Sequence, residues 1–109
     1  MTVKQLADTE TFSSVTLPDG ERVISGAYVG DLLSWVMGHA NGGECLVTIM
    51  SNVNVLAVAS LLDLSCVILA ENVKPDDEFL SLAKEKEINV LSSSERTYEV
   101  CTMLYEALR

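Results

Sequence analysis

The segment "ECLVTIMSNVNVLAVASLLDLSCVILA", residues 44–70, decides the fold class of this chain. Its two ends, "ECLVTIM" and "SCVILA", are short continuous apolar runs, which are typical of strands buried on both faces of a sheet. The stretch from Asn54 to Asp63 predicts a helix between them, and Asn52 or Asn54 can cap its first turn. A strand, a helix and a second strand in this order predict a parallel βαβ unit.

The same alternation continues on both sides of this unit. Upstream, "RVISGAYV" (22–29) predicts a strand, and a helix follows from about Asp31 to His39, where "NGG" ends it. Downstream, Pro75 and three acidic residues predict a helix start, "INVLS" (88–92) predicts the last strand, and Ser94 opens a final helix. The apolar positions of that helix recur at helical spacing: Tyr98, Cys101, Leu104, Tyr105 and Leu108.

The N-terminal segment predicts a short helix and one further strand. Thr2 can cap a helix over Val3 to Ala7, "TFSSVTL" (11–17) predicts a strand, and "LPDG" (17–20) is a turn signal. We therefore expect this strand to pair antiparallel with the strand over residues 22–29. The complete pattern predicts one α/β domain over residues 1–109: a three-layer α/β/α sandwich with a mostly parallel sheet and an antiparallel N-terminal strand.

Charge and composition exclude several classes of protein. The formal net charge is −9, from sixteen acidic and seven basic residues, which disfavours nucleic acid and anionic membrane surfaces as partners. No apolar run is long enough to span a membrane and no secretory signal begins the chain, so we expect a cytoplasmic protein. The three cysteines are far apart in sequence and there is one histidine, which predicts buried thiols and neither a metal site nor a cofactor.

Two of the predicted helices carry more apolar surface than one sheet covers. The helix from Asn54 to Asp63 is apolar in nearly every direction, and Trp35 falls outside the apolar stripe of its own helix. We therefore expect a homodimer, in which a second copy of the chain covers the excess apolar surface. Its predicted interface residues are Trp35, Val55, Val58, Ala59 and Leu62.

No catalytic motif is present, and we expect no enzymatic activity. "GAYVG" (26–30) lacks the spacing of a dinucleotide-binding or phosphate-binding loop, and its helix begins with Asp31, which we expect to cap that helix. Small polar residues instead follow or flank several strands, where open α/β sheets bind ligands. They are either ordinary caps and turn formers or a site for a small polar or anionic ligand, formed by Ser25, Gly26, Tyr28, Thr48, Asn52 and Ser93.

Three segments together carry a family resemblance: "ISGAYVGDLLSWVMGHANGGECLVTI", "NVLAVASLLDLSCVILAENVKPD" and "INVLSSSERTYEVCTMLYE". Over about residues 21–105 the chain resembles the DRTGG domain, with Glu21, Arg22, Ser25, Gly26 and Ala27 at the positions that name the family. The resemblance implies a fold similar to the N-terminal domain of the HPr kinase/phosphorylase. It also implies a regulatory or structural role without a known reaction. Related copies lie beside CBS domains in some inorganic pyrophosphatases, where they contribute to dimerisation.

Two functions follow from this resemblance. The first is a bacterial regulatory or accessory module that forms a homodimer and senses a small ligand such as a nucleotide. The alternative is a ligand-free interaction module attached to a redox enzyme such as an iron-only hydrogenase, since the resemblance implies that stand-alone copies of the domain are encoded near subunits of such enzymes.

Overall fold

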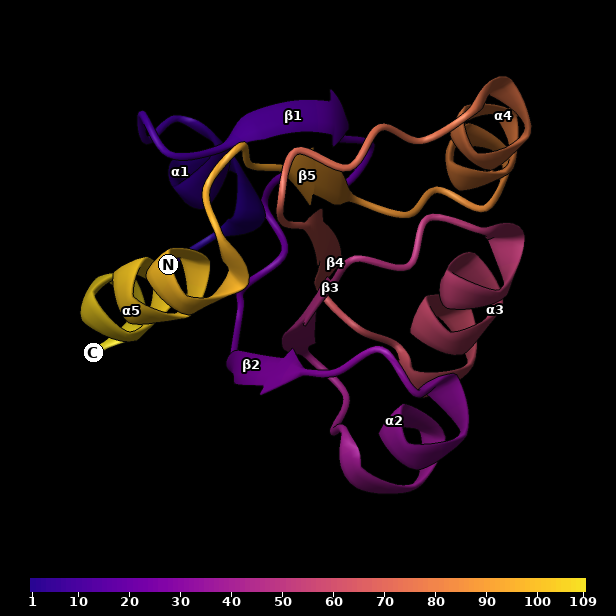
Figure 1. Cartoon of the computed structure of the whole chain (residues 1–109), viewed down its shortest axis with the longest axis horizontal. Coiled ribbons are helices and arrows are strands. Elements are labelled where there is room, and N and C mark those ends of the chain that lie inside the picture. Colours follow the sequence, from indigo (N-terminus) through magenta and orange to yellow (C-terminus); the bar gives the residue numbers. More distant parts are fainter.

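A computed structural model describes all residues from 1 to 109 (Figure 1). Five helices and five strands alternate along most of the chain, as the apolar runs predict. In chain order they are α1 (Val3–Ala7), β1 (Ser13–Thr16), β2 (Gly26–Val29), α2 (Leu33–His39), β3 (Glu44–Thr48), α3 (Val53–Leu62), β4 (Cys66–Leu69), α4 (Asp77–Glu85), β5 (Val90–Ser92) and α5 (Thr97–Leu108).

The strands form one sheet in the order β1-β5-β4-β3-β2. Strands β2, β3, β4 and β5 run parallel to one another and β1 is antiparallel to β5, which confirms the predicted mixed α/β fold with a mostly parallel sheet. The predicted pairing of β1 with β2 is wrong, because these strands lie at opposite edges of the sheet. Long-range contacts hold β1 and its turn beside β5: Thr16 Oγ1 donates to the Ile88 carbonyl at 2.8 Å, and Asn89 Oδ1 accepts from the Asp19 N–H at 2.9 Å.

Helices cover both faces of the sheet, with α2, α3 and α4 on one face and α1 and α5 on the other (Figure 1). Alternate residues of the buried strands supply the two cores. Leu46 and Leu69 point toward α3 and α4, where Phe79 is fully buried, whereas Cys45 and Ile68 point toward α5. None of the five helices combines the length and the apolarity that a membrane crossing requires.

Helix α3 is buried within a single copy of the chain. It lies on the sheet between α2 and α4, so three neighbours share its apolar surface. Val55, Val58 and Ala59 are buried and Leu62 is half-buried, while Leu61 is the one large side chain left 74% exposed. The premise that a second copy must cover Val55, Val58 and Ala59 is therefore wrong, although the homodimer itself stays a prediction.

Helix α5 uses a narrower apolar stripe than its sequence predicts. Val100 and Leu104 are buried against the sheet, whereas Tyr98 and Tyr105 are 76% and 67% exposed. Helix α5 lies on the outside of its face of the sheet, so the side of the helix that points away from the sheet is in contact with solvent. Both tyrosine rings are therefore available for contact with a ligand or a partner.

Candidate functional site

The six predicted ligand-site residues do not gather at one place. Thr48 ends β3, Asn52 caps α3 and Ser93 follows β5, so these three lie at the carboxyl edge of the parallel strands. Ser25 and Gly26 lie at the opposite end, where β2 begins. Tyr28 lies inside β2 and packs toward the core under α2, α3 and α4.

The polar atoms at the carboxyl edge are already used within the chain. The Thr48 hydroxyl accepts from the Met50 N–H at 3.1 Å, Asn52 Oδ1 accepts from the Asn54 N–H at 2.9 Å, and Ser93 Oγ accepts from the Glu95 N–H at 3.1 Å. These are the local bonds of turns and helix caps. The arrangement thus matches the simpler interpretation that these residues are caps and turn formers.

Asp31 does not cap its own helix, contrary to expectation. The N-cap of α2 is Leu32, which makes no side-chain cap bond. Asp31 Oδ1 instead accepts from the Thr48 hydroxyl at 2.8 Å and from the Ile49 N–H at 2.9 Å. The carboxylate therefore ties the loop after β2 to the loop after β3, and it places negative charge at the carboxyl edge.

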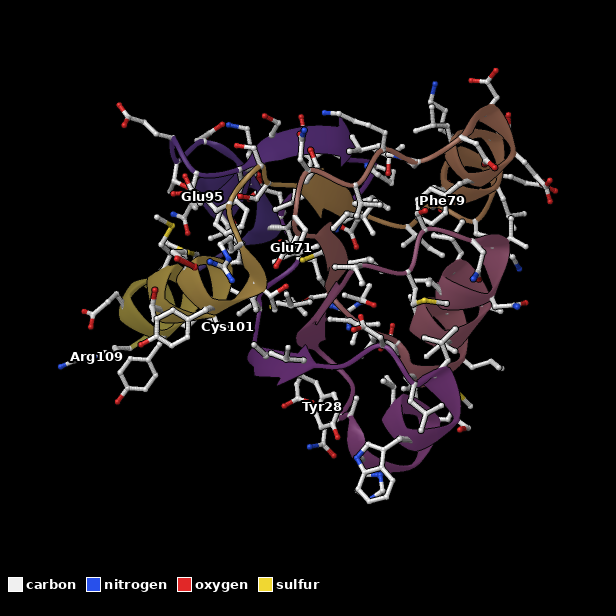
Figure 2. All side chains as sticks on the ribbon, viewed as in Figure 1. Tyr28, Glu71, Phe79, Glu95, Cys101 and Arg109 are labelled. Atoms are coloured by element: carbon white, nitrogen blue, oxygen red, sulfur yellow. The ribbon has the colours of Figure 1, made fainter.

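A second carboxylate occupies the switch point of the sheet. Strand β4 leads to α4 on one face and β5 leads to α5 on the other, which is where open α/β folds usually bind ligands (Figure 1). Glu71 Oε2 accepts from the Thr97 N–H at 2.7 Å and from its hydroxyl at 3.0 Å, at the start of α5 (Figure 2). These bonds lower the pKa of Glu71. An acid of the chain itself thus sits where an external anion would approach the helix.

The backbone around Glu71 is unusual as well. Glu71 and Asn72 both adopt left-handed conformations, with φ of 63° and 58°. Their N–H groups donate to the carbonyls of Glu95 and Ser93 at 2.8 and 2.9 Å, which joins the loops after β4 and β5. Glu71 is missing from the residues predicted for this site, although an acid directly after the buried run "SCVILA" was a usable signal.

The residues at the family-naming positions form a structural clamp at the amino edge. Arg22 donates from Nη1 to Asp63 Oδ1 at 3.1 Å and from Nη2 to the Asp63 carbonyl at 2.8 Å. The Gly43 N–H donates to the same carbonyl at 2.9 Å, and the Gly43 carbonyl accepts from the Ser25 N–H at 3.0 Å. Gly43 has φ of +86°, and a Cβ there would lie 2.8 Å from Ser25 Oγ, so glycine is required. These contacts join the segment before β2, the loop before β3 and the loop after α3.

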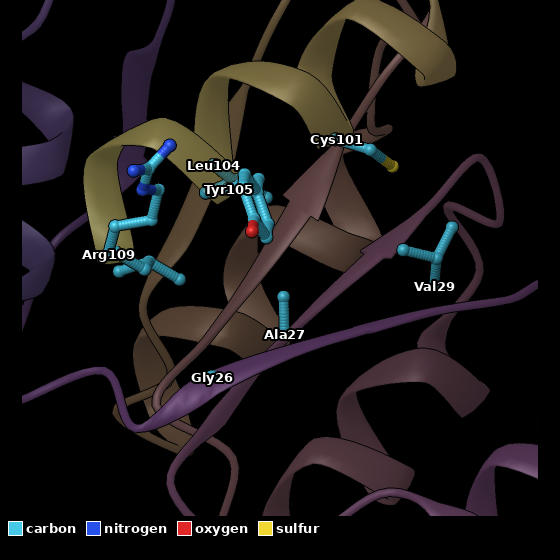
Figure 3. A pocket seen from close by; sticks show the side chains of 8 residues that line it. Gly26, Ala27, Val29, Cys101, Leu104, Tyr105 and Arg109 are labelled. Carbon is cyan, nitrogen blue, oxygen red and sulfur yellow. The ribbon is translucent and has the colours of Figure 1, made fainter.

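An open cavity of about 350 Å³ lies between β2 and α5 (Figure 3). We call it the β2–α5 groove. Its walls are mostly apolar, and its polar features are the Tyr105 ring and the Arg109 guanidinium, whose carbon lies 5.6 Å from the centre of that ring. Among the predicted ligand-site residues, Gly26 belongs to it. The residues that line it are Gly26, Ala27, Val29, Cys101, Leu104, Tyr105, Leu108 and Arg109.

The three cysteines meet beneath this groove despite their distance in sequence. Cys45 and Cys66 are direct partners in the β3–β4 register, and Cys101 of α5 packs against the same core. A hydrogen bond with Cys45 and burial raise the pKa of Cys66 well above its ordinary value, and burial raises the pKa of Cys101. The buried Cys45 and Cys66 therefore behave as small apolar groups, whereas the half-buried Cys101 is partly accessible. No group of three His, Cys, Asp or Glu side chains is placed to hold a metal ion.

These features define a small α/β domain whose own carboxylates occupy the conventional ligand edge and whose β2–α5 groove is open. The DRTGG domain family matches residues 20–107, and the chain belongs to that family. This membership confirms the resemblance found in the sequence. No curated protein matches the chain.

One solved structure is similar over nearly the whole chain. It is the crystal structure of the CBS and DRTGG domains from the regulatory region of Clostridium perfringens pyrophosphatase, complexed with its activator, diadenosine tetraphosphate. The TM-score is 0.76 at 15% sequence identity, and the match covers 98% of this chain and 47% of that chain. The likeness shows the same fold, and the present chain spans about half the length of that regulatory region.

Proposed function

We propose that this chain is a non-catalytic, cytoplasmic regulatory module, a single domain over residues 1–109 that works as a homodimer and senses a nucleotide. Family membership supports the regulatory role. The similar pyrophosphatase region is complexed with a nucleotide activator, which supports the ligand class. The observation that carries the proposal is the β2–α5 groove, since it is the open cavity that combines an aromatic face with a cation.

The chemistry of the groove suits a nucleotide better than the carboxyl edge does. A base can stack on the exposed Tyr105 ring, and a phosphate can pair with Arg109 in exchange for its exposed ion pair with Glu106 at 3.4 Å. The volume of about 350 Å³ lies within the usual range of ligand sites. At the carboxyl edge, Asp31 and Glu71 present carboxylates that would repel a polyphosphate, and the one cation close to Glu71, Arg96, helps to lower the pKa of that carboxyl.

Calorimetry and thermal shift measurements with ATP, AMP and diadenosine tetraphosphate test this function. A nucleotide that binds the folded chain at 100 times its Kd should stabilise it by about 2.7 kcal/mol. Tyr105→Ala should abolish most of the shift. Tyr98→Ala is the matched control, because Tyr98 is exposed on the same helix and does not line the groove. Equal loss in both variants would remove the groove as the site, and a flat response of the unmodified chain would remove nucleotide sensing.

The second candidate is a ligand-free interaction module attached to a redox enzyme such as an iron-only hydrogenase. The enzyme partner rests on the family resemblance. The observation in favour of an interaction surface is the set of exposed apolar side chains on and beside β2, among them Val29, Leu32 and Trp35. Affinity isolation of the chain from its own cells, with a nucleotide screen that stays flat, would favour this function over sensing.

A further inference from the structure

Strand β2 is an unprotected edge of the sheet. It is the last strand in the order β1-β5-β4-β3-β2, so one side of its backbone has no partner strand over residues 26–29. Directly before it the edge is covered, because the Ile24 N–H donates to the Met1 carbonyl at 3.0 Å and Val23 forms a bridge with Thr2. Proteins usually block such an edge with lysine, proline or a bulge, and "GAYV" (26–29) contains none of these. The opposite edge strand, β1, is interrupted by an irregularity between Ser14 and Thr16 and is followed by Pro18.

Exposed apolar side chains flank this edge on both faces of the sheet. Val29, on the strand itself, is 46% exposed. On one face α2 is the last helix of its layer. Its N-cap, Leu32, is 67% exposed, and its Trp35 is 56% exposed and stacked on His39. On the other face lies the β2–α5 groove with Tyr105. Apolar side chains of this size, gathered on one side of a small domain, are typical of a protein interface.

The segment that holds β2 and α2 carries little charge. Residues 24–43 contain one acidic residue, Asp31, and no lysine or arginine, although the chain as a whole has a net charge of −9. Asp31 already accepts two hydrogen bonds within the chain. A basic partner would be attracted to the other, acidic surfaces, whereas a second copy meets little like-charge repulsion along residues 24–43. The acids close to this segment include Glu44, beside Gly26, and Glu106, which pairs with Arg109 at 3.4 Å.

We infer that two copies of the chain pair through β2, antiparallel and around a two-fold axis, to form one continuous ten-stranded sheet. A strand can pair with its own copy around a two-fold axis perpendicular to the sheet, and the pairing is then antiparallel. The same axis sets α2 against its copy on one face and α5 against its copy on the other. The inference rests on the homodimer of the proposed function and locates its interface.

The required contact area is modest for this molecule. A standard interface buries about 800 Å² on each partner, which is roughly one seventh of the 5857 Å² surface of the chain. Strand β2 with the flanking sides of α2 and α5 offers the side chains that would be covered. The pairing would use the backbone groups of β2 and the apolar surface around them at once.

Sedimentation velocity and light scattering on the full chain test this interface. The unmodified chain should show twice its 11.8 kDa mass at tens of micromolar. Val29→Lys places a charge on the edge and should raise the dimer Kd at least tenfold. Leu61→Lys is the matched control, since Leu61 is also exposed but lies on α3, and its dimer Kd should stay within twofold. Circular dichroism checks that both variants fold.

Hydrogen exchange gives a second readout that needs no substitution. Amides of residues 26–29 should exchange more slowly as the protein concentration rises through the dimer Kd, while amides of β1 stay unchanged. If the dimer persists in Val29→Lys and exchange at β2 is independent of concentration, the β2 interface is wrong and the homodimer stands. If the unmodified chain is a monomer at tens of micromolar, both the interface and the homodimer are wrong.

Discussion

Arg22→Ala should weaken the clamp at the amino edge of the sheet without unfolding the chain. The substitution removes an ion pair of 3.1 Å to the Asp63 carboxylate and a hydrogen bond of 2.8 Å to the Asp63 carbonyl. The Asp63 side chain is 78% exposed, so the ion pair contributes about 0.2–1 kcal/mol. The bond from a charged donor to the carbonyl adds about 1 kcal/mol in this partly exposed position.

The total expected loss is therefore about 1–2 kcal/mol of unfolding free energy, or a fall of about 4–10 °C in Tm for a domain of this size. The Asp63 carbonyl keeps its bond from the Gly43 N–H, so no orphaned acceptor enlarges the cost. Urea unfolding followed by circular dichroism at pH 7 measures the change. Asp63→Asn removes the charge but keeps a residue that tolerates the left-handed conformation of φ 57°, and it should cost about 0.5 kcal/mol.

The double variant decides whether the clamp is real. Arg22→Ala should cost less in the Asp63→Asn background than in the unmodified chain, because the two side chains interact directly. A loss below about 0.3 kcal/mol for Arg22→Ala, or strictly additive effects in the double variant, would refute the clamp. In that case, the residues at the family-naming positions would not act by joining these loops.

Two further predictions concern titratable groups. The pKa of Glu71 is lower in the folded chain than in the unfolded chain, so its contribution to stability is present at neutral pH and is lost as the pH falls through the folded pKa. Glu71→Gln should therefore flatten the decline of the urea midpoint below about pH 5, and an unchanged decline would contradict the bond to Thr97. Among the thiols, the half-buried Cys101 alone should react with an aromatic disulfide reagent in the folded chain at pH 7, whereas Cys45 and Cys66 should react after denaturation. Rapid native reaction of two thiols would contradict their burial.

The elements that local pattern controls are predicted well from the sequence. Strands β3 and β4 are continuous apolar runs because both of their faces are covered. The turn at Gly43 lies directly before β3, and the N-cap Asn52 marks the start of α3. The alternation of such segments leaves few topologies other than a layered α/β sheet. Fold class and most element positions therefore follow from residues close together in the chain.

What the sequence could not predict depends on neighbours that are distant in the chain. The turn signal near Pro18 indicates a hairpin, but Thr16 and Asp19 bind the segment before β5 and so set the strand partner. The apolarity of α3 indicates an uncovered face, but a helix between two others is covered on three sides. The roles of Asp31 and Glu71 depend on N–H groups that only the folded loops bring within reach.

The proposed ligand site and the proposed dimer interface are coupled, because both involve β2. Carboxylates of the chain occupy the loops where α/β domains usually hold anions, and the proposed ligand groove and the proposed dimer interface both use β2. In the proposed arrangement Val29 borders the groove and also lies on the paired edge. Binding in the groove and pairing at the edge then share contacts, so each must change the affinity of the other by the same factor. An edge strand suits this coupling, because a small shift of β2 on ligand binding would change the surface that the second copy contacts.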